Sequence, residues 1–223
     1  NVSKCYPNGS NALENVNIEI KKGEFVFVVG PSGAGKSTFI KMIFREELPS
    51  EGSLVVNGRN VTEMTLKDVP YLRRGLGIIF QDYRLLQDKT VYENVAFAMQ
   101  VVEAPRREMQ KRVNTVLDLV GLKDKVKSFP TQLSGGEQQR VAIARAIVNN
   151  PMVVIADEPT GNLDPETSWD IMKIFDRINK DGTTIVMATH DKSIVDTMKK
   201  RVIAIENGRI IRDEARGVYG YED

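Results

Sequence analysis

The segment Gly30-Pro31-Ser32-Gly33-Ala34-Gly35-Lys36-Ser37 constrains the fold of this 223-residue chain more than any other feature. It fits the pattern G-x-x-x-x-G-K-[ST], follows the apolar run Phe25–Val29 directly and precedes a helix-forming run. Glycines let such a loop wrap around a phosphate group, and the following helix adds the positive end of its dipole. The sequence therefore predicts a strand, a phosphate-binding loop and a helix that begins near Lys36.

The side chains of this loop indicate which phosphate compound it binds. Lys36 can reach the β and γ phosphates of a nucleoside triphosphate, and the Ser37 hydroxyl can ligate Mg²⁺. A glycine-rich turn with an incidental lysine is the alternative, and the strand–loop–helix context makes it the weaker one. We therefore predict that ATP and Mg²⁺ bind here, with nucleotide contacts from Gly30, Pro31, Ser32, Gly33, Ala34, Gly35, Lys36, Ser37 and Thr38.

Three apolar runs predict buried parallel strands, namely Phe25–Val29, Val153–Ala156 and Ile185–Ala188. Each is followed by glycine or polar residues, which matters because open α/β sheets bind ligands at the carboxyl ends of their strands. Helical character runs from about Val91 to Asn150.

Two Asn-Gly pairs predict hairpin turns, Asn57-Gly58 after Leu54–Val56 and Asn207-Gly208 after Val202–Ile205. We expect these flanking segments to form an antiparallel β region. The prediction is one α/β domain over residues 1–223: a P-loop NTPase core, an antiparallel β subdomain and an inserted helical subdomain at about residues 84–150.

Composition narrows the classes of partner. A formal net charge of +1, from 31 basic and 30 acidic residues, is too balanced for a general nucleic-acid binder, so no direct nucleic-acid contact is expected. The single cysteine, Cys5, fits a reducing cytoplasm. No apolar run approaches the roughly 18–20 residues of a membrane span, and the start lacks the regions of a signal peptide. We expect a soluble chain whose membrane role, if any, comes through a partner.

The run Val153–Ala156 ends in two carboxylates, Asp157 and Glu158. Delivered beside the phosphate loop, Asp157 would hold Mg²⁺, and Glu158 would take a proton from the attacking water as general base. An acidic pair in a solvated turn is the alternative, and the upstream phosphate loop argues against it.

The segment Leu133-Ser134-Gly135-Gly136-Glu137-Gln138-Gln139 precedes a helix with Val141, Ala144, Ile147 and Val148 on one face. The pattern Ser134-x-x-Glu137 is that of a capping box at a helix start. A capped, glycine-opened helix N-terminus is also a phosphate site, so both interpretations hold together.

Taken together, these motifs resemble those of ABC ATPases over essentially the whole chain. Gly30–Ser37 is similar to the family's Walker A, Val153–Glu158 to its Walker B with the catalytic glutamate, and Leu133–Gln138 to its signature motif. Gln81 resembles the Q-loop glutamine, Gly161–Asp164 the D-loop, His190 the switch histidine, and Tyr6 the aromatic that stacks on adenine. Apart from this single aromatic residue, the six motifs stand in the family's order.

The resemblance implies a role for each residue. Glu158, His190, Gln81 and Lys36 would be catalytic, and Ser37, Gln81 and Asp157 would hold the metal. Simpler alternatives are a structural histidine, a polar loop glutamine and a packing tyrosine. Asp164 before Pro165 is also a good helix N-cap, which is compatible with a dimer contact.

The resemblance also implies how such a chain works. Two copies face each other head to tail as a homodimer formed on ATP binding, so that Leu133, Ser134, Gly135, Gly136, Glu137 and Gln138 act on the ATP of the partner subunit. An integral membrane partner would dock at the helical subdomain, with candidate lining residues Tyr83, Leu85, Leu86, Val91, Tyr92, Val95 and Phe97.

Within the family, Ala156–Asp164 resembles a branch that does mechanical work on the periplasmic or outer-face side of the membrane, and Phe80–Leu86 with the loop Gly30–Gly35 most resembles the members of that branch that act in cell division. That likeness implies a membrane partner resembling FtsX, activation of cell-wall hydrolases, and a cytoplasmic position peripheral to the inner face of the membrane. The alternatives are a MacB-type or lipoprotein-release transport ATPase, and a soluble ABC ATPase acting on DNA or ribosomes. A long coiled coil or a second such domain would favour the soluble class, and the chain has neither.

Overall fold

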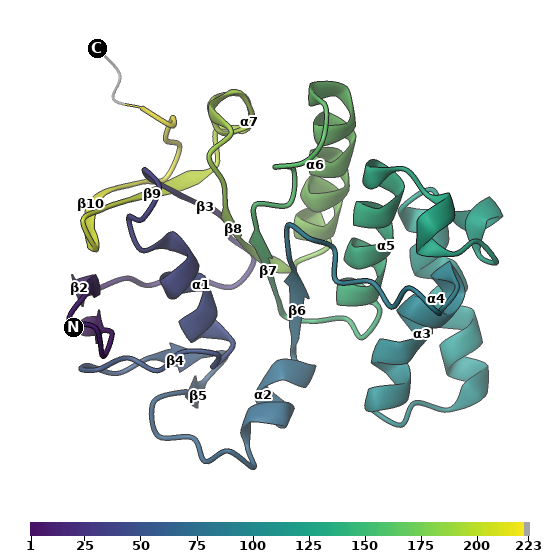
Figure 1. Cartoon of the computed structure of the whole chain (residues 1–223), viewed down its shortest axis with the longest axis horizontal. Coiled ribbons are helices and arrows are strands. Elements are labelled where there is room, and N and C mark those ends of the chain that lie inside the picture. Colours follow the sequence, from purple (N-terminus) through teal and green to yellow (C-terminus); the bar gives the residue numbers. More distant parts are fainter. Residues whose placement is uncertain (221–223) are drawn as a thin grey trace.

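In the computed structural model, which describes residues 1–220, a six-stranded central sheet has the order β10-β9-β3-β8-β7-β6 (Figure 1). Neighbouring strands are parallel except for β10, which runs antiparallel to β9. The predicted parallel strands are therefore confirmed. The bounds are β3 (Phe25–Val29), β6 (Leu76–Ile79), β7 (Val153–Asp157), β8 (Thr184–Ala188), β9 (Arg201–Glu206) and β10 (Arg209–Glu214).

Two strands depart from the prediction. β6 was missed because Gly77 interrupts its short apolar run. The glycine is needed for packing, since a Cβ there would lie 2.7 Å from Ala146 O in helix α5 (Gly135–Ile147). The predicted antiparallel pairing of β9 with β10 is confirmed, but β9 also belongs to the central sheet, where it lies parallel to β3.

The two faces of the sheet bury different partners because side chains alternate along each strand. Val26 and Val28 of β3 pack with helix α1 (Lys36–Ile43) and with the antiparallel strands. Phe25, Phe27 and Val29 pack on the opposite face, in the cluster that also holds helix α6 (Pro165–Lys180) and α5.

Short antiparallel pairs complete the α1 side: β1 (Val2–Cys5) with β2 (Asn11–Val16), and β4 (Val55–Val56) with β5 (Arg59–Asn60). The predicted Asn-Gly turns are confirmed. Asn57 and Gly58, like Asn207 and Gly208, have left-handed φ angles, as tight hairpin turns with two such residues require.

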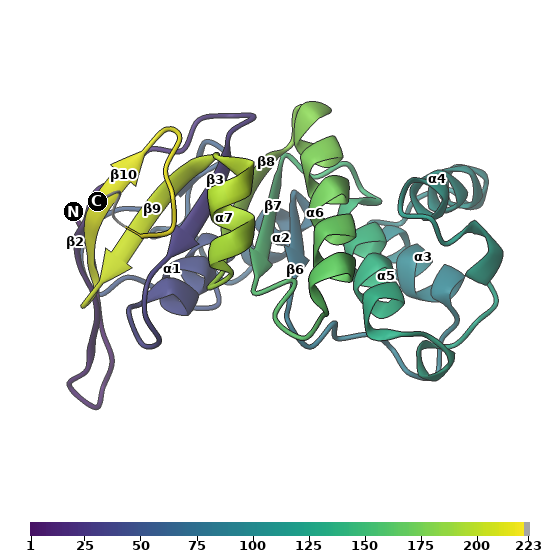
Figure 2. The ribbon, with the colours of Figure 1, turned by 90° about the horizontal axis from the view of Figure 1, so that it is seen from above.

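Helices occupy the end of the molecule away from β9 and β10 (Figures 1 and 2). They are α3 (Val91–Val101), α4 (Arg106–Leu119) and α5, with short turns at Lys123–Lys125 and Pro130–Gln132; α2 (Val69–Arg74) precedes β6. More of the surface of α5 is buried than the single apolar face predicted from the sequence. Ala142 and Ile143 are buried as well, because α5 packs against α3, α4, α6 and β6 at once.

Four parallel neighbours, β3, β8, β7 and β6, bring their carboxyl ends to one edge of the sheet. The segments that follow these strands carry Gly30, His190, Glu158 and Gln81. The topology thus assembles residues far apart in the sequence. Within residues 1–220, no helix combines the length and the apolar character that crossing a bilayer requires.

Candidate functional site

The phosphate loop joins β3 to α1, and neighbouring strands press on its backbone. Gly30 has a φ of 144°, and a Cβ on it would lie 2.0 Å from Ile205 O. Gly35 has a φ of 111°, and its Cβ would lie 2.3 Å from Ala12 O. Both positions therefore exclude any side chain, through backbone conformation and through space.

The loop is preorganised for an anion. Gly35 is the N-cap of α1 and offers no side-chain cap, so the first backbone N–H groups of the helix remain available to a ligand. The Lys36 ammonium donates to Gly30 O at 2.7 Å and to Pro31 O at 3.0 Å. Its charge is therefore held directly over the loop, where phosphate oxygens are better acceptors than neutral carbonyls.

Tyr6 follows β1 and reaches the phosphate-loop helix. Its hydroxyl lies 3.2 Å from Thr38 Oγ1, and the Lys4 ammonium lies 4.9 Å from its ring centroid. The ring is half-buried and borders the N-terminal end of α1. Tyr6 and Thr38, both predicted to contact the nucleotide, therefore lie next to each other.

Asp157 ends β7 next to the phosphate loop. Burial raises the pKa of Asp157, and the neighbouring Glu158 raises it further, while Lys36, Lys41 and a hydrogen bond from the Ser37 hydroxyl lower it. A buried carboxylate paired with a hydroxyl gains from a nearby cation, so Ser37 and Asp157 fit a hard cation such as Mg²⁺.

The residue types limit how such an ion is held. The described part of the chain contains no group of three or more His, Cys, Asp or Glu side chains able to hold a metal by themselves. Ser37, Asp157 and the amide of Gln81 offer single oxygen atoms. Such a set suits Mg²⁺ that keeps phosphate and water ligands.

Glu158 follows Asp157 with a left-handed φ of 50°. Its N–H donates to Ala188 O of β8 at 3.0 Å, which fixes the turn. Its Oε2 atom accepts hydrogen bonds from His190 Nδ1 at 2.7 Å and from His190 N at 3.3 Å. The histidine therefore contacts the predicted general base directly, which was not foreseen from the sequence.

Gln81 follows β6 and contacts the loop after β7. Its Nε2 atom donates to Asn162 Oδ1 at 3.3 Å, and Asn162 Nδ2 donates to Gln81 O at 3.4 Å. A Cβ on Gly161 would lie 2.9 Å from Gln81 Nε2, so that glycine makes room for the amide. The structure thus joins the predicted Q-loop and D-loop.

The signature segment forms the N-terminus of α5, and the predicted capping box is confirmed. Ser134 Oγ accepts from Glu137 N at 3.2 Å, and Glu137 Oε2 accepts from Ser134 N at 2.8 Å. Backbone and side-chain hydrogen bonds from Ser134, with Lys125 nearby, lower the pKa of Glu137 despite its partial burial.

The signature residues are not equally accessible. Ser134 is exposed, and Gly135, Glu137 and Gln138 are half-buried. Leu133 and Gly136 are buried, and a Cβ on Gly136 would lie 2.4 Å from Thr167 Cγ2 of α6. Only the outer part of the segment is open to a ligand.

Asp164 caps α6, as predicted, by accepting from Thr167 N at 2.9 Å with Pro165 at the first helical position. This bond and others from the helix N-terminus lower the pKa of Asp164. The side chain is exposed beside the loop that Gln81 contacts.

Two residues near the site carried no signal in the sequence. Asn162 was predicted only as part of the D-loop, without its contact to Gln81. Burial raises the pKa of the Tyr219 phenol, the nearby Glu158 raises it further, and the Gly30 backbone lowers it. Nothing in the spacing of these residues pointed to either contact.

The sequence matches a known protein family. A family model described as "ABC transporter" matches residues 13–161. The "Cell division ATP-binding protein FtsE" of Streptococcus pneumoniae serotype 2 (strain D39 / NCTC 7466) is 62% identical over 222 residues, covering 100% of this chain and 96% of that protein. The protein of the same name from Bacillus subtilis (strain 168) is 61% identical over 222 residues, covering 100% and 97%.

Solved structures agree. The chain is similar to the "ATP-binding cassette MJ0796 bound to ADP and Pi", solved as a dimer in "a post-hydrolysis state". The TM-score is 0.86 at 36% identity, and the match covers 99% of this chain and 98% of that one. The two chains therefore share the fold over nearly their whole lengths.

Proposed function

Because this chain belongs to the ABC transporter family and is an ATPase of the ABC type, we propose that it powers a cell-division complex of the FtsE type. The observation that carries this proposal is identity of 62% over the full chain with a cell-division ATP-binding protein. The relatives' names say that they bind ATP and act in cell division. The site described above has the groups that ATP binding and hydrolysis need: the phosphate loop, Asp157 and Glu158.

ATP would lie along the phosphate loop. Backbone N–H groups between Gly30 and Thr38, where only Pro31 lacks one, would surround the β and γ phosphates. The Lys36 ammonium would move from the Gly30 and Pro31 carbonyls to phosphate oxygens. Tyr6, anchored to Thr38, would stack on the adenine ring.

Mg²⁺ would be held by Ser37 Oγ, with Asp157 and Gln81 as further oxygen ligands, directly or through water. When bound, the ion neutralises charge that develops on the phosphates. The protein's part is to supply a carboxylate whose pKa is raised by burial and by the neighbouring Glu158, so that a bound cation would stabilise its charged form.

Glu158 would act as general base on the attacking water. His190 holds one carboxylate oxygen with two hydrogen bonds, which leaves Oε1 free to accept the proton. Because 64% of the His190 side chain is exposed, the remaining ring nitrogen is open to the γ-phosphate.

Two copies would close over two nucleotides. Ser134 lies exposed at the N-terminus of α5, where free N–H groups and the helix dipole favour an anion. Asp164 lies exposed at the start of α6 and would contact the second copy. The similar cassette MJ0796 was solved as a dimer with ADP and phosphate, which supports a homodimer formed on ATP binding.

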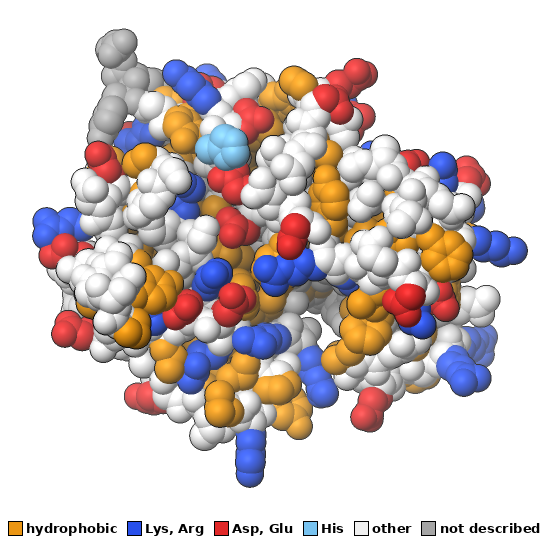
Figure 3. Space-filling view, in the orientation of Figure 1, with side chains coloured by type: hydrophobic (Ala, Val, Ile, Leu, Met, Phe, Trp, Pro, Cys, Tyr) orange, Lys and Arg blue, Asp and Glu red, His pale blue; other side chains and the backbone are white. Residues whose placement is uncertain are grey.

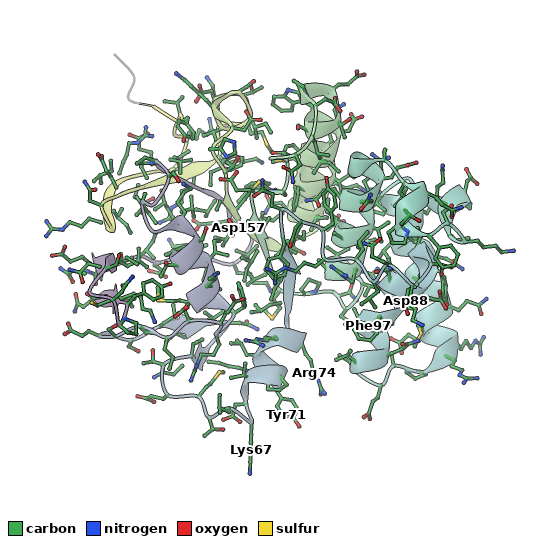
Figure 4. All side chains as sticks on the ribbon, in the orientation of Figure 1. Lys67, Tyr71, Arg74, Asp88, Phe97 and Asp157 are labelled. Atoms are coloured by element: carbon green, nitrogen blue, oxygen red, sulfur yellow. The ribbon has the colours of Figure 1, made fainter. Side chains whose placement is uncertain are left out.

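A membrane partner resembling FtsX would dock between α2 and α3. Tyr71, Phe97 and Val101 are large apolar side chains that remain 58%, 47% and 49% exposed. Arg74 of α2 and Met99 of α3 line a hollow of 590 Å³. Figure 4 shows Arg74 on α2 and Phe97 on α3, and Figure 3 shows hydrophobic side chains, in orange, over both helices. Exposed apolar groups of this kind mark interaction sites.

Three of the seven predicted lining residues are core residues that a partner could not reach. Val91 and Val95 are fully buried and Leu85 nearly so, because they form the core beneath α3. Phe97 alone among the predicted set is a largely exposed hydrophobic residue. Docking at this end would place the chain on the cytoplasmic side, peripheral to the inner face of the cell membrane, without direct contact to nucleic acid.

Affinity capture of the tagged Glu158→Gln chain from membranes solubilised with ATP tests the proposal. We expect a single integral membrane protein to co-purify, and depletion of either protein to block division. Recovery of a transport permease, with normal division after depletion, would instead assign the chain to a transport ATPase.

A further inference from the structure

The loop from Gln81 to Leu86 holds an unusual backbone. Tyr83 has a φ of 58° and Arg84 a φ of 46°, two successive left-handed residues, neither of them glycine or asparagine. L-residues with side chains rarely adopt this conformation, so the surrounding structure must hold it in place.

Arg145 of α5 supplies the restraint. Its guanidinium donates to Arg84 O at 2.6 Å through one terminal nitrogen and to Tyr83 O at 2.8 Å through the other. The rigid fork of an arginine fixes two acceptors at once. Within residues 1–220 no carboxylate forms an ion pair with Arg145, so the two carbonyls are its main polar partners.

Other contacts hold the side chains of the same two residues. The Arg84 guanidinium lies 3.6 Å from the Phe80 ring centroid, and a Cβ on Gly135 would lie 3.1 Å from the Tyr83 hydroxyl. Both ends of α5 therefore touch the loop: Gly135 at the signature end and Arg145 ten residues later.

The loop in turn positions Gln81 at the catalytic edge, the edge of the central sheet where the segments that carry Gly30, Glu158 and His190 also lie. Gln81 lies two positions before Tyr83, and its amide meets Asn162 at 3.3 Å. If the two left-handed residues relaxed, the chain direction after Gln81 would change and the amide would leave this contact.

We propose that Arg145 is a positioning residue for ATP hydrolysis, which holds residues 81–86 in the conformation that keeps Gln81 at the catalytic edge and ties that loop to the signature helix. The proposal rests on the role of Gln81 proposed above. Nucleotide binding by the phosphate loop does not depend on it, because none of the hydrogen bonds of Arg145 reaches residues 30–38.

The test is a double-mutant cycle on the purified full chain, with Arg145→Met, Gln81→Ala and the combination of both. We expect Arg145→Met to lower kcat by about 10- to 100-fold, the loss that a misplaced group at a reacting centre causes, while KM for ATP changes by less than about twofold. Gln81→Ala should lower kcat to a similar extent. The combination should be no slower than the worse single variant, because both act through one group.

Arg112→Met is the matched control. Arg112 of α4 also donates to two successive carbonyls of α5, Val148 O at 3.0 Å and Ile147 O at 3.3 Å, and burial lowers the pKa of both arginines. Its acceptors lie just after Arg145, at the C-terminal end of the helix, but none of its hydrogen bonds reaches residues 81–86. We expect a similar loss of thermal stability with nearly normal kcat.

If Arg145→Met does not fold, Arg145→Lys replaces it. Lysine keeps the charge but lacks the planar fork, so kcat should fall while the melting temperature stays near that of the wild type. Normal kcat in the Arg145 variant would overturn the proposal, as would equal kcat losses in Arg112→Met or losses that multiply in the double variant. Normal kcat in Gln81→Ala would remove the role of Gln81 and leave ATP binding and the cell-division role untouched.

Discussion

One carboxylate oxygen of Glu158 is shared by both donors of His190: the imidazole Nδ1 at 2.7 Å and the backbone N–H at 3.3 Å. This arrangement orients the carboxylate, and neither donor of His190 contacts its second oxygen. Glu158 also has a left-handed backbone, held by its N–H bond to Ala188 O. Position and orientation of the base are thus set by the strand next to its own.

Glu158→Gln should separate binding from hydrolysis. The amide has the same shape but cannot accept a proton, so we expect kcat to fall about 10²- to 10⁴-fold while ATP affinity is retained. Single-turnover hydrolysis and fluorescent-nucleotide binding measure the two quantities. Sedimentation at saturating Mg-ATP should show accumulated dimer, and rapid turnover by this variant would assign the base to another residue.

His190→Ala should act through the same carboxylate. Without the ring, Glu158 keeps one hydrogen bond from the backbone, and we expect a fall in kcat of about 10²-fold, the lower end of the range for proton transfer by a positioned side chain. Adding His190→Ala to Glu158→Gln should cost little more. Fully multiplying effects would mean that the histidine acts on the phosphate alone.

Gly35→Ala tests the packing of the phosphate loop. A methyl group there would meet Ala12 O at 2.3 Å as well as an unfavourable φ of 111°, so we expect loss of ATP binding and a lower melting temperature. Gly182→Ala is the control, since its φ of 96° is strained but no atom lies within 4 Å. The control should cost about 1–3 kcal/mol of unfolding free energy and leave ATP binding intact.

The strands and motifs that proved predictable are those in which local sequence carries the information. β3, β7 and β8 are apolar runs that lead directly into functional residues. The capping box involves only Ser134 and Glu137, three positions apart, so it can be recognised from the local sequence. β6 escaped because a glycine required by helix packing broke its pattern.

Contacts between distant segments could not be predicted in the same way. Gln81 and Asn162 are 81 positions apart, and only the parallel pairing of β6 with β7 brings their loops together. The restraint of Tyr83 and Arg84 by Arg145 depends on backbone angles that these residue types do not favour, so tertiary structure overrides the local preference.

Asp157→Asn should lower the activity but raise the free energy of unfolding, and the gain in unfolding free energy should depend on pH. Burial raises the pKa of Asp157 above its unfolded value, so the folded state favours the protonated form and loses stability as pH rises through that pKa. Asparagine has no charge to desolvate. At pH 7 and without nucleotide we expect the variant to gain about 0.5–2 kcal/mol of unfolding free energy.

The gain should disappear below about pH 3, where the carboxyl group is protonated in both states. Urea unfolding at several pH values measures this difference. The same variant should lose the extra thermal stability that Mg²⁺ confers in the presence of ATP, which chelation with EDTA removes from the wild type. A variant less stable than the wild type at pH 7 would contradict the assigned cause of the shift.

Phe97→Asp should uncouple the chain from its membrane partner. Phe97 lies on α3, the helix that contributes Met99 to the hollow lined by Arg74, and about half of its surface is already in water, so the substitution removes little from the core (Figure 4). We expect the melting temperature and the ATPase activity of the isolated chain to stay near wild-type values. Co-purification of the partner should fall at least tenfold, since an aromatic anchor at an interface typically contributes about 2 kcal/mol or more.

Ile211→Asp is the matched control, because Ile211 has nearly the same exposure, 46% against 47%, but lies on β10 at the other end of the molecule. It should leave partner binding unchanged. If both variants lose the partner equally, the effect is one of charge or folding. If Phe97→Asp binds normally, the partner docks on another face, and the exposed aromatic groups of α2 and α3 need a different explanation.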